Sequence, residues 1–189
     1  VADGRIAAVG GLSAPARQVL EARGLIAIPG GIDAHTHFAM PWRGGATADD
    51  FLTGTTAALF GGTTTVIDAA VQSKGRTLAR ALQSWHAKAE GRCLTDYAFH
   101  MAITDLDGRT CAEMESMARA GVTSFKLYMA YPGTLMSDDG AILTALLRSN
   151  EVGGLVSLHC ENGPAIETLV RRAIDAGRTE PRVHALTRP

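Results

Sequence analysis

Short apolar runs alternate with stretches of helical periodicity along the chain from about residue 29 onward. β-Branched and apolar runs bounded by glycine predict buried strands, whereas apolar positions that repeat every three or four residues predict amphipathic helices. We expect strands at 32–38, 63–70, 94–103, 123–129 and 155–159. We expect helices at 50–60, 77–90, 111–120 and 165–176, and one capped by Asp138 or Asp139 that runs to 147.

Strands that alternate with helices predict an α/β fold with a parallel sheet and right-handed crossovers. Two architectures have this element order: an open doubly wound sheet and part of a TIM-type (β/α)8 barrel. A complete barrel takes about 250 residues, and the region 29–189 is shorter than that. A partial barrel made of about the first five βα units fits this length.

Residues 1–28 have a different pattern, with short apolar runs at 5–9 and 18–20 that are separated by turn residues. This pattern predicts part of a small β-sandwich domain, with pairing partners outside the chain. The chain begins without methionine and stops after 189 residues without a closing element. We therefore expect it to be a segment of a longer protein, with a boundary between 1–28 and the barrel region 29–189.

Composition narrows the class of partner. The chain is 46% hydrophobic and 20% charged, with a formal net charge of -1, which is typical of a globular protein and gives no reason to expect nucleic acid or a membrane surface as partner. No apolar stretch approaches the roughly 20 residues that span a bilayer. The start does not resemble a signal peptide, and three widely spaced cysteines favour a reducing compartment. We expect a cytoplasmic protein.

His35 and His37 are the first candidates for chemistry, near the end of the first expected strand. Alternate side chains of a strand share one face, so one cation can reach both imidazoles. Zinc accepts imidazole nitrogen at about 2.0–2.1 Å. One histidine would be an ordinary polar residue at a strand end, but two at this spacing favour metal ligands.

Lys126 lies inside the fourth expected strand, and His159 ends the fifth. Burying an ammonium group is costly, so Lys126 either reaches solvent at a sheet edge or carries a neutral amine that is modified or coordinated. Alone, Lys126 favours the first interpretation, and His159 fits a polar core residue as well as a ligand. Three strands that deliver nitrogen to the same end of one sheet favour a shared metal site.

Two other polar residues are weaker candidates. Asp68 ends the second expected strand, where it has a structural role or orients a neighbouring group behind the ligands. His100 lies in mid-strand and is expected to be satisfied within the core.

Five motifs carry a resemblance that runs from about Asp3 to Pro189: PGGIDAHTHFAMPWRGGATADDF, GTTAALFGGTTTVID, SFKLYMAYPG, SLHCENG and HALTRP. Together they resemble the amidohydrolase superfamily and, within it, the dihydropyrimidinase and D-hydantoinase family. Dihydroorotases and allantoinases share the His-x-His pair, but Met129, Ala130 and Tyr131 after the lysine strand are typical of the hydantoinase branch.

The resemblance implies two divalent metal ions, with zinc expected, at the mouth of a (β/α)8 barrel. His35 and His37 would bind the more buried ion and His159 the more exposed one. Lys126 would be carboxylated and would bridge both ions. Tyr131 would donate a hydrogen bond to the substrate carbonyl and stabilise the oxyanion.

The implied reaction is hydrolysis of a cyclic amide, a dihydropyrimidine or a hydantoin, to an N-carbamoyl amino acid by a hydroxide that bridges the metals. The segment 38–45 would line the substrate pocket, and the protein would be a homo-oligomer, a tetramer by resemblance. In the family a further histidine and an aspartate come from a sixth and an eighth strand, which this chain lacks. Two alternatives stay open: a truncated or non-catalytic dihydropyrimidinase-like protein, and a related amidohydrolase such as an allantoinase or a dihydroorotase.

Overall fold

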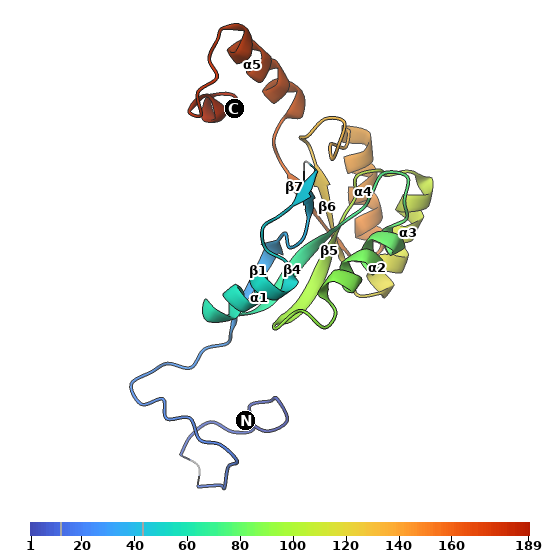
Figure 1. Ribbon diagram of the computed structural model, residues 1–189. Coiled ribbons are helices and arrows are strands. Elements are labelled where there is room, and N and C mark those ends of the chain that lie inside the picture. The colour runs from blue at the N-terminus through green and yellow to red at the C-terminus, as the bar shows by residue number, and fades with distance from the viewer. Residues whose placement is uncertain (12, 43) are drawn as a thin grey trace.

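The computed structural model describes residues 1–11, 13–42 and 44–189, and its centre is a five-stranded parallel sheet (Figure 1). Each strand lies beside the strand of this sheet that precedes it in the chain. A doubly wound sheet would reverse its order at a switch point, so the sequential order supports the partial barrel. The strands are β1 (Gly31–Thr36), β4 (Thr63–Val71), β5 (Asp96–Ala102), β6 (Ser124–Tyr128) and β7 (Leu155–His159).

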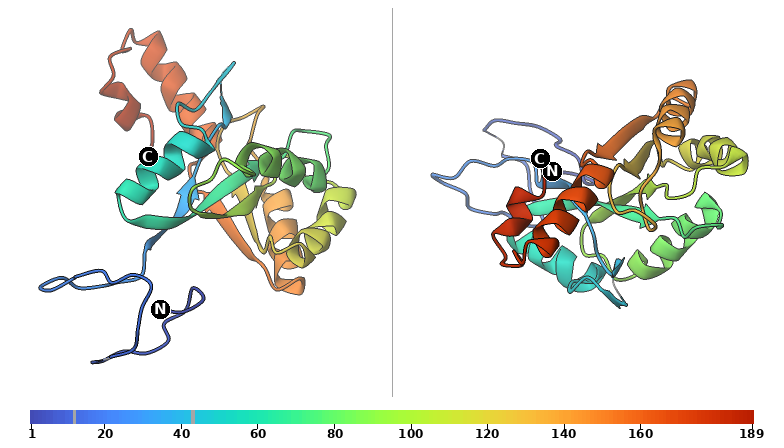
Figure 2. Two further views of the ribbon diagram at one scale, coloured as in Figure 1. Left: turned by 60° about the horizontal axis from the view of Figure 1, so that its bottom comes forward. Right: turned by 90° about the horizontal axis from the view of Figure 1, so that it is seen from above.

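Four helices cover one side of the sheet, as the two views of Figure 2 show. They are α1 (Phe51–Phe60), α2 (Leu78–Ala89), α3 (Gly108–Arg119) and α4 (Asp139–Glu151). Beyond β7, α5 (Gly163–Asp175) and the short α6 (Val183–Leu186) lie apart from the sheet (Figure 1). A small antiparallel pair, β2 (Pro41–Trp42) and β3 (Gly45–Ala46), follows β1.

Side-chain caps fix where the helices begin. Asp50 accepts hydrogen bonds from two backbone N–H groups of the first turn of α1, and Thr53 completes a capping box. Asp107 caps α3, so this helix begins at Gly108, three residues before the expected position 111. Helix α4, capped by Asp138, continues to Glu151 and not only to 147.

The two faces of the sheet carry different chemistry because successive strand residues point to opposite sides. On β6, Phe125 and Leu127 are fully buried in the main hydrophobic cluster with residues of the four helices. Lys126 and Tyr128 alternate with them and face the other side. Burial of one face therefore determines which polar groups the opposite face presents.

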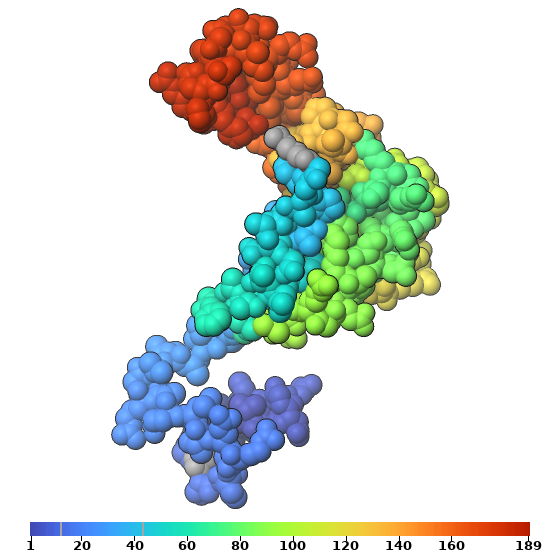
Figure 3. Space-filling model, viewed as in Figure 1, coloured from blue at the N-terminus to red at the C-terminus, as the bar shows by residue number. Residues whose placement is uncertain are grey.

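Residues 1–30 contain no strand in their described part, although runs at 5–9 and 18–20 predicted strands. Ala2 and Arg5 form one isolated antiparallel bridge. A strand needs a hydrogen-bonded neighbour, and the described residues give this segment none. In Figure 3 the segment extends away from the body of the molecule. The small β domain stays a prediction.

Replacing Phe125 with alanine should lower the free energy of unfolding by about 3–5 kcal/mol, because it leaves a cavity in the core beneath the helices. Phe60→Ala is the matched control, since that ring is 92% exposed, and it should change stability by less than about 0.5 kcal/mol. Denaturant titration measures both values. Equal losses for the two variants would show that the core does not lie between this sheet face and its helices.

Candidate metal centre

His35 and His37 lie together at the carboxyl end of β1. Their ring centroids are 5.1 Å apart and the rings are nearly perpendicular. The pairing of β1 with β4 is irregular here, because Asp33 pairs with Val66 and Thr36 with Asp68, so three steps on one strand oppose two on the other. Such a bulge re-aims side chains near a site.

One cavity of about 340 Å³ brings the sequence-predicted site residues together. The strands β1, β6 and β7 and the loop after β6 contribute to its wall, which places it at the carboxyl ends of the parallel strands. This is where barrel enzymes gather their active sites. The lining residues are His35, His37, Lys126, Tyr131 and His159, with Met40, Trp42, Thr47, Tyr128 and Leu135 around them.

His37 has a buried ring nitrogen, Nδ1, that has no hydrogen-bond partner in the described structure. A buried polar atom without a partner is rare and calls for an explanation. Burial lowers the pKa of His37, and the nearby His35 and Lys126 lower it further. The imidazole is therefore biased toward its neutral form, which is the form that binds metal ions.

Lys126 is only 9% exposed. Its Nζ lies 5.6 Å from the centre of the Tyr128 ring, and the ion pairs of the described residues do not include it. Burial lowers the pKa of its amine, because a low-dielectric site disfavours the charged form. The lysine is therefore biased toward its neutral, nucleophilic form.

His159 faces the same cavity from the end of β7, but its Nε2 already has a partner. It lies 2.9 Å from a carboxylate oxygen of Glu161, and this hydrogen bond is the main cause that lowers the pKa of Glu161. A metal ion bound at Nε2 would have to displace Glu161. The sequence did not single out this carboxylate as a competitor.

Tyr131 has a φ of 66°, a left-handed conformation that is uncommon outside glycine. Its carbonyl oxygen accepts hydrogen bonds from the backbone N–H groups of Thr134, Leu135 and Met136, so the tight turn stabilises this conformation. Strained backbone of this kind clusters at functional sites. The hydroxyl lies 3.4 Å from His159 Nε2, within the cavity.

The side chains that line the cavity are of types that bind metal ions, but the described residues do not supply a complete set of ligands. Among the described residues, no three His, Cys, Asp or Glu side chains converge closely enough to hold one ion. The preformed part is the imidazole pair with its unpartnered nitrogen. Further ligands would come from His159 and from a Lys126 that has gained an acidic group.

Tyr128 also lines the cavity, which the sequence did not predict. Its hydroxyl is buried without a hydrogen-bond partner, and burial is the main cause that raises its pKa to about 12. The position two residues after Lys126 on one strand was the available signal, since both must face the same side.

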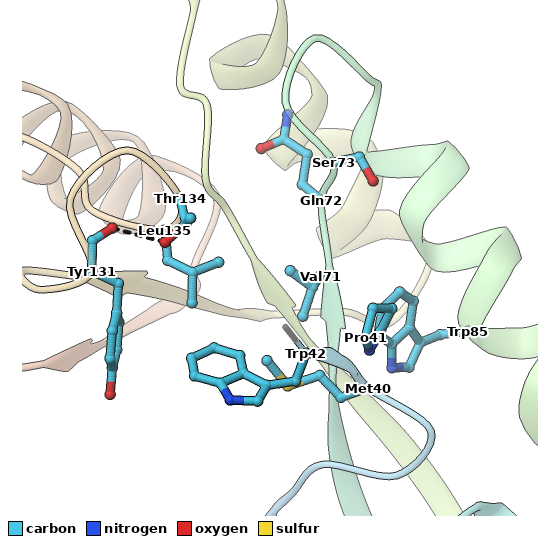
Figure 4. Close-up of a pocket in the computed structure, with 10 residues that line it drawn as sticks. All are labelled: Met40, Pro41, Trp42, Val71, Gln72, Ser73, Trp85, Tyr131, Thr134 and Leu135. Carbon is cyan, nitrogen blue, oxygen red and sulfur yellow. Dashed lines mark hydrogen bonds between the residues drawn. The ribbon is translucent and has the colours of Figure 1, made fainter. Parts of the chain in front are cut away.

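A second, apolar pocket of about 490 Å³ adjoins the cavity (Figure 4). The segment 38–45 was expected to line a substrate pocket, and Met40 and Trp42 do line both hollows. Position 43 lies outside the described residues. Figure 4 shows the Trp42 ring between Tyr131 on one side and the pocket residues Pro41 and Trp85 on the other.

Comparison with known proteins finds relatives that align with the whole chain. The model of the amidohydrolase family matches residues 26–184. The D-hydantoinase of Streptomyces coelicolor is 50% identical over 194 aligned residues, which cover the whole of this chain and 42% of that protein. The rat dihydropyrimidinase is 37% identical, with the whole chain and 38% of that protein covered. The chain thus spans about two fifths of the length of these curated relatives.

Solved structures agree with these sequence comparisons. The dihydropyrimidinase of Brevibacillus agri matches with a TM-score of 0.83 and 46% identity, over 85% of this chain and 35% of that one. The D-hydantoinase of Bacillus sp. AR9 matches with the same TM-score at 44% identity, over 85% of this chain and 36% of that one.

Within the described residues, no helix is both long and apolar enough to cross a membrane.

If His37 is a metal ligand, His37→Ala should weaken zinc binding by more than about 100-fold, since loss of a ligand costs more than loss of a residue behind one. Competition with a chromophoric chelator measures the dissociation constant. His184→Ala is the matched control, since this exposed histidine lies outside the cavity, and it should leave the constant unchanged. Equal affinity of the two variants would remove His37 from the centre.

Proposed function

Because this chain belongs to the amidohydrolase family, we propose that it forms part of a metal-dependent cyclic amidase of the dihydropyrimidinase and hydantoinase type. The substrate would be a dihydropyrimidine or a hydantoin, and the product an N-carbamoyl amino acid. The observation that carries the proposal is the shared cavity of His35, His37, Lys126, His159 and Tyr131. The substrate class comes from the names of two relatives of the chain, D-hydantoinase and dihydropyrimidinase.

His35 and His37 would hold one divalent ion and His159 a second, with zinc expected for both. When bound, the ions would polarise the ring carbonyl and lower the pKa of a water molecule, so that it attacks at neutral pH. For His159 to act as a ligand, Glu161 must release Nε2 and can then accept a hydrogen bond from elsewhere. The lowered pKa of His37 reduces competition between a proton and a metal ion for its ring nitrogen.

Lys126 would bridge the two ions after carboxylation. Its neutral amine attacks the carbon of carbon dioxide, forms one N–C bond and releases one proton, which leaves a carbamate anion. The burial that lowers the pKa of the amine favours this reaction, because the protonated amine has no lone pair. The carbamate would also give the buried side chain a negative charge that nearby divalent ions could compensate, which would relieve the cost of burying an uncompensated lysine.

Tyr131 would donate its hydroxyl hydrogen to the carbonyl oxygen of the ring as negative charge develops there. Donors that are already oriented stabilise an oxyanion most strongly, because they need no reorganisation during the reaction. The turn that stabilises the φ of 66° at this residue supplies that orientation. The apolar pocket of Figure 4 would take a substituent on the ring.

We further propose that the protein is a cytoplasmic homo-oligomer.

Lys126→Ala should lower the metal content and abolish ring opening, because both ions lose their common ligand. Metal analysis and the hydrolysis of dihydrouracil and a 5-substituted hydantoin, both with the purified full-length protein, measure the two effects. In protein equilibrated with ¹³C-bicarbonate, ¹³C NMR should show a carbamate carbon that Lys126→Ala lacks. Full metal content and turnover in the variant would exclude the carbamate.

Tyr131→Phe should lower kcat by about 10²–10³-fold, as expected for the loss of one oxyanion donor, with the metal content unchanged. Steady-state kinetics and metal analysis on the same preparation separate the two effects. Thr134→Ser is the control in the same turn, because it keeps the hydroxyl that donates to the Tyr131 carbonyl. Unchanged kcat in Tyr131→Phe would assign oxyanion stabilisation to another group.

A further inference from the structure

Asp68 is a fully buried carboxylate on β4, on the side of the sheet that faces the helices. Its Oδ2 accepts hydrogen bonds from the Thr36 hydroxyl at 2.9 Å and from the Phe38 N–H at 2.7 Å. Its Oδ1 accepts one from Trp85 Nε1 at 3.0 Å. Burial raises the pKa of this carboxyl, and the three donors oppose that rise. A buried carboxylate with three aimed donors is a costly feature that no step of the proposed reaction uses.

Two of these donors, on Thr36 at the end of β1 and on Phe38 just after it, are the neighbours of one metal-ligand candidate. Thr36 and Phe38 flank His37, so one oxygen of Asp68 holds the chain before and after it. Alternation along β1 places Thr36 toward the helices, opposite the cavity that His35 and His37 line. Asp68 therefore fixes this segment from behind without contact with the cavity.

Helix α2 extends the support to the next residue. Lys88 Nζ lies 3.9 Å from the centre of the Trp85 ring, and it donates a hydrogen bond of 2.8 Å to the carbonyl oxygen of Ala39. Ala39 has a φ of 47°, a strained turn that needs support to persist. Asp68, Trp85 and Lys88 thus hold the turn that directly follows the ligand pair.

His100 contacts β1 from the inner face of the sheet. Its Nε2 lies 2.8 Å from the Ala34 carbonyl oxygen, and its Nδ1 lies 2.5 Å from the Ser124 hydroxyl. This confirms that His100 is hydrogen-bonded within the fold, as its mid-strand position predicted. The chain is therefore held on both sides of the bulge that carries the histidine pair.

We propose that Asp68 is a positioning residue for the metal centre, which fixes His37 by holding the two residues on either side of it. This inference rests on the proposed metal-dependent function. Groups that orient metal ligands are worth about 10–100-fold in metal affinity, because an unfixed ligand must be ordered at the moment of binding.

The primary test is Asp68→Asn. This change keeps the shape of the side chain but replaces one accepting oxygen with an NH₂ group, which cannot accept a hydrogen bond from the donors that now face Asp68. Zinc affinity of the purified full-length protein, measured by chelator competition, should fall about 10–100-fold. The visible spectrum of the cobalt-loaded protein should change as well, since it reports ligand geometry. Thr55→Val is the matched control: it removes a buried hydroxyl that contacts Phe51 and Leu94, and it should leave affinity and spectrum unchanged.

A pair of substitutions at Thr36 decides the matter if Asp68→Asn does not fold. Thr36→Val keeps the shape of the side chain and removes the hydroxyl, so zinc affinity should fall, by less than in Asp68→Asn because the Phe38 N–H still binds. Thr36→Ser keeps the hydroxyl and should restore the affinity. A drop in Thr36→Val that Thr36→Ser reverses supports the proposal.

The outcomes separate this inference from the proposed function. A parent protein that binds no zinc would overturn the metal-dependent function itself. A parent protein that binds zinc, with the same affinity and cobalt spectrum in Asp68→Asn or in Thr36→Val, would overturn only the positioning role. A similar loss in Thr55→Val would also overturn it, since any buried polar loss would then have the same effect.

Discussion

The alternation of side chains along the parallel strands is the constraint on which this structure depends. Four helices cover one face, so alternate residues such as Phe125 and Leu127 must be apolar and packed. The intervening residues then face the barrel interior, whatever their chemistry. A lysine and a tyrosine on β6 and histidines on β1 and β7 face one cavity for this reason. The packing of the outer face determines where the reactive groups of the inner face point.

Local periodicity in the sequence was enough to predict the order of strands and helices. Spacing also predicted that His35, His37, Lys126 and His159 converge at one end of the sheet. Features that depend on tertiary contacts were not accessible in this way. The pair of Glu161 with His159 and the three donors to Asp68 join partners whose relative geometry no local pattern specifies. The strands expected in 1–28 are missing from its described residues for a related reason, since a strand depends on its neighbour as much as on its own residues.

The polar groups of the molecule are divided between the two sides of β1. The cavity side has nitrogen atoms with spare hydrogen-bonding capacity, such as Nδ1 of His37, and a lysine whose charge is disfavoured. The helix side has a carboxylate whose capacity is used by three donors. Nδ1 of His37 has no partner among the described residues, as the proposed metal binding would require, whereas the Asp68 carboxylate on the other side is fully hydrogen-bonded, as a fixed support would be. Both conditions are met within a few residues of one strand.

The sequential order of the sheet has a consequence for assembly. Every strand of the sheet pairs with the one before it, so each new βα unit adds to an existing edge of the sheet. The histidines, however, come from β1 and β7, the first and last strands of that order. The two edges approach each other only when the sheet curls. A growing chain would therefore pack β1 against β4 before β7 can bring His159 to the cavity that His35 and His37 line.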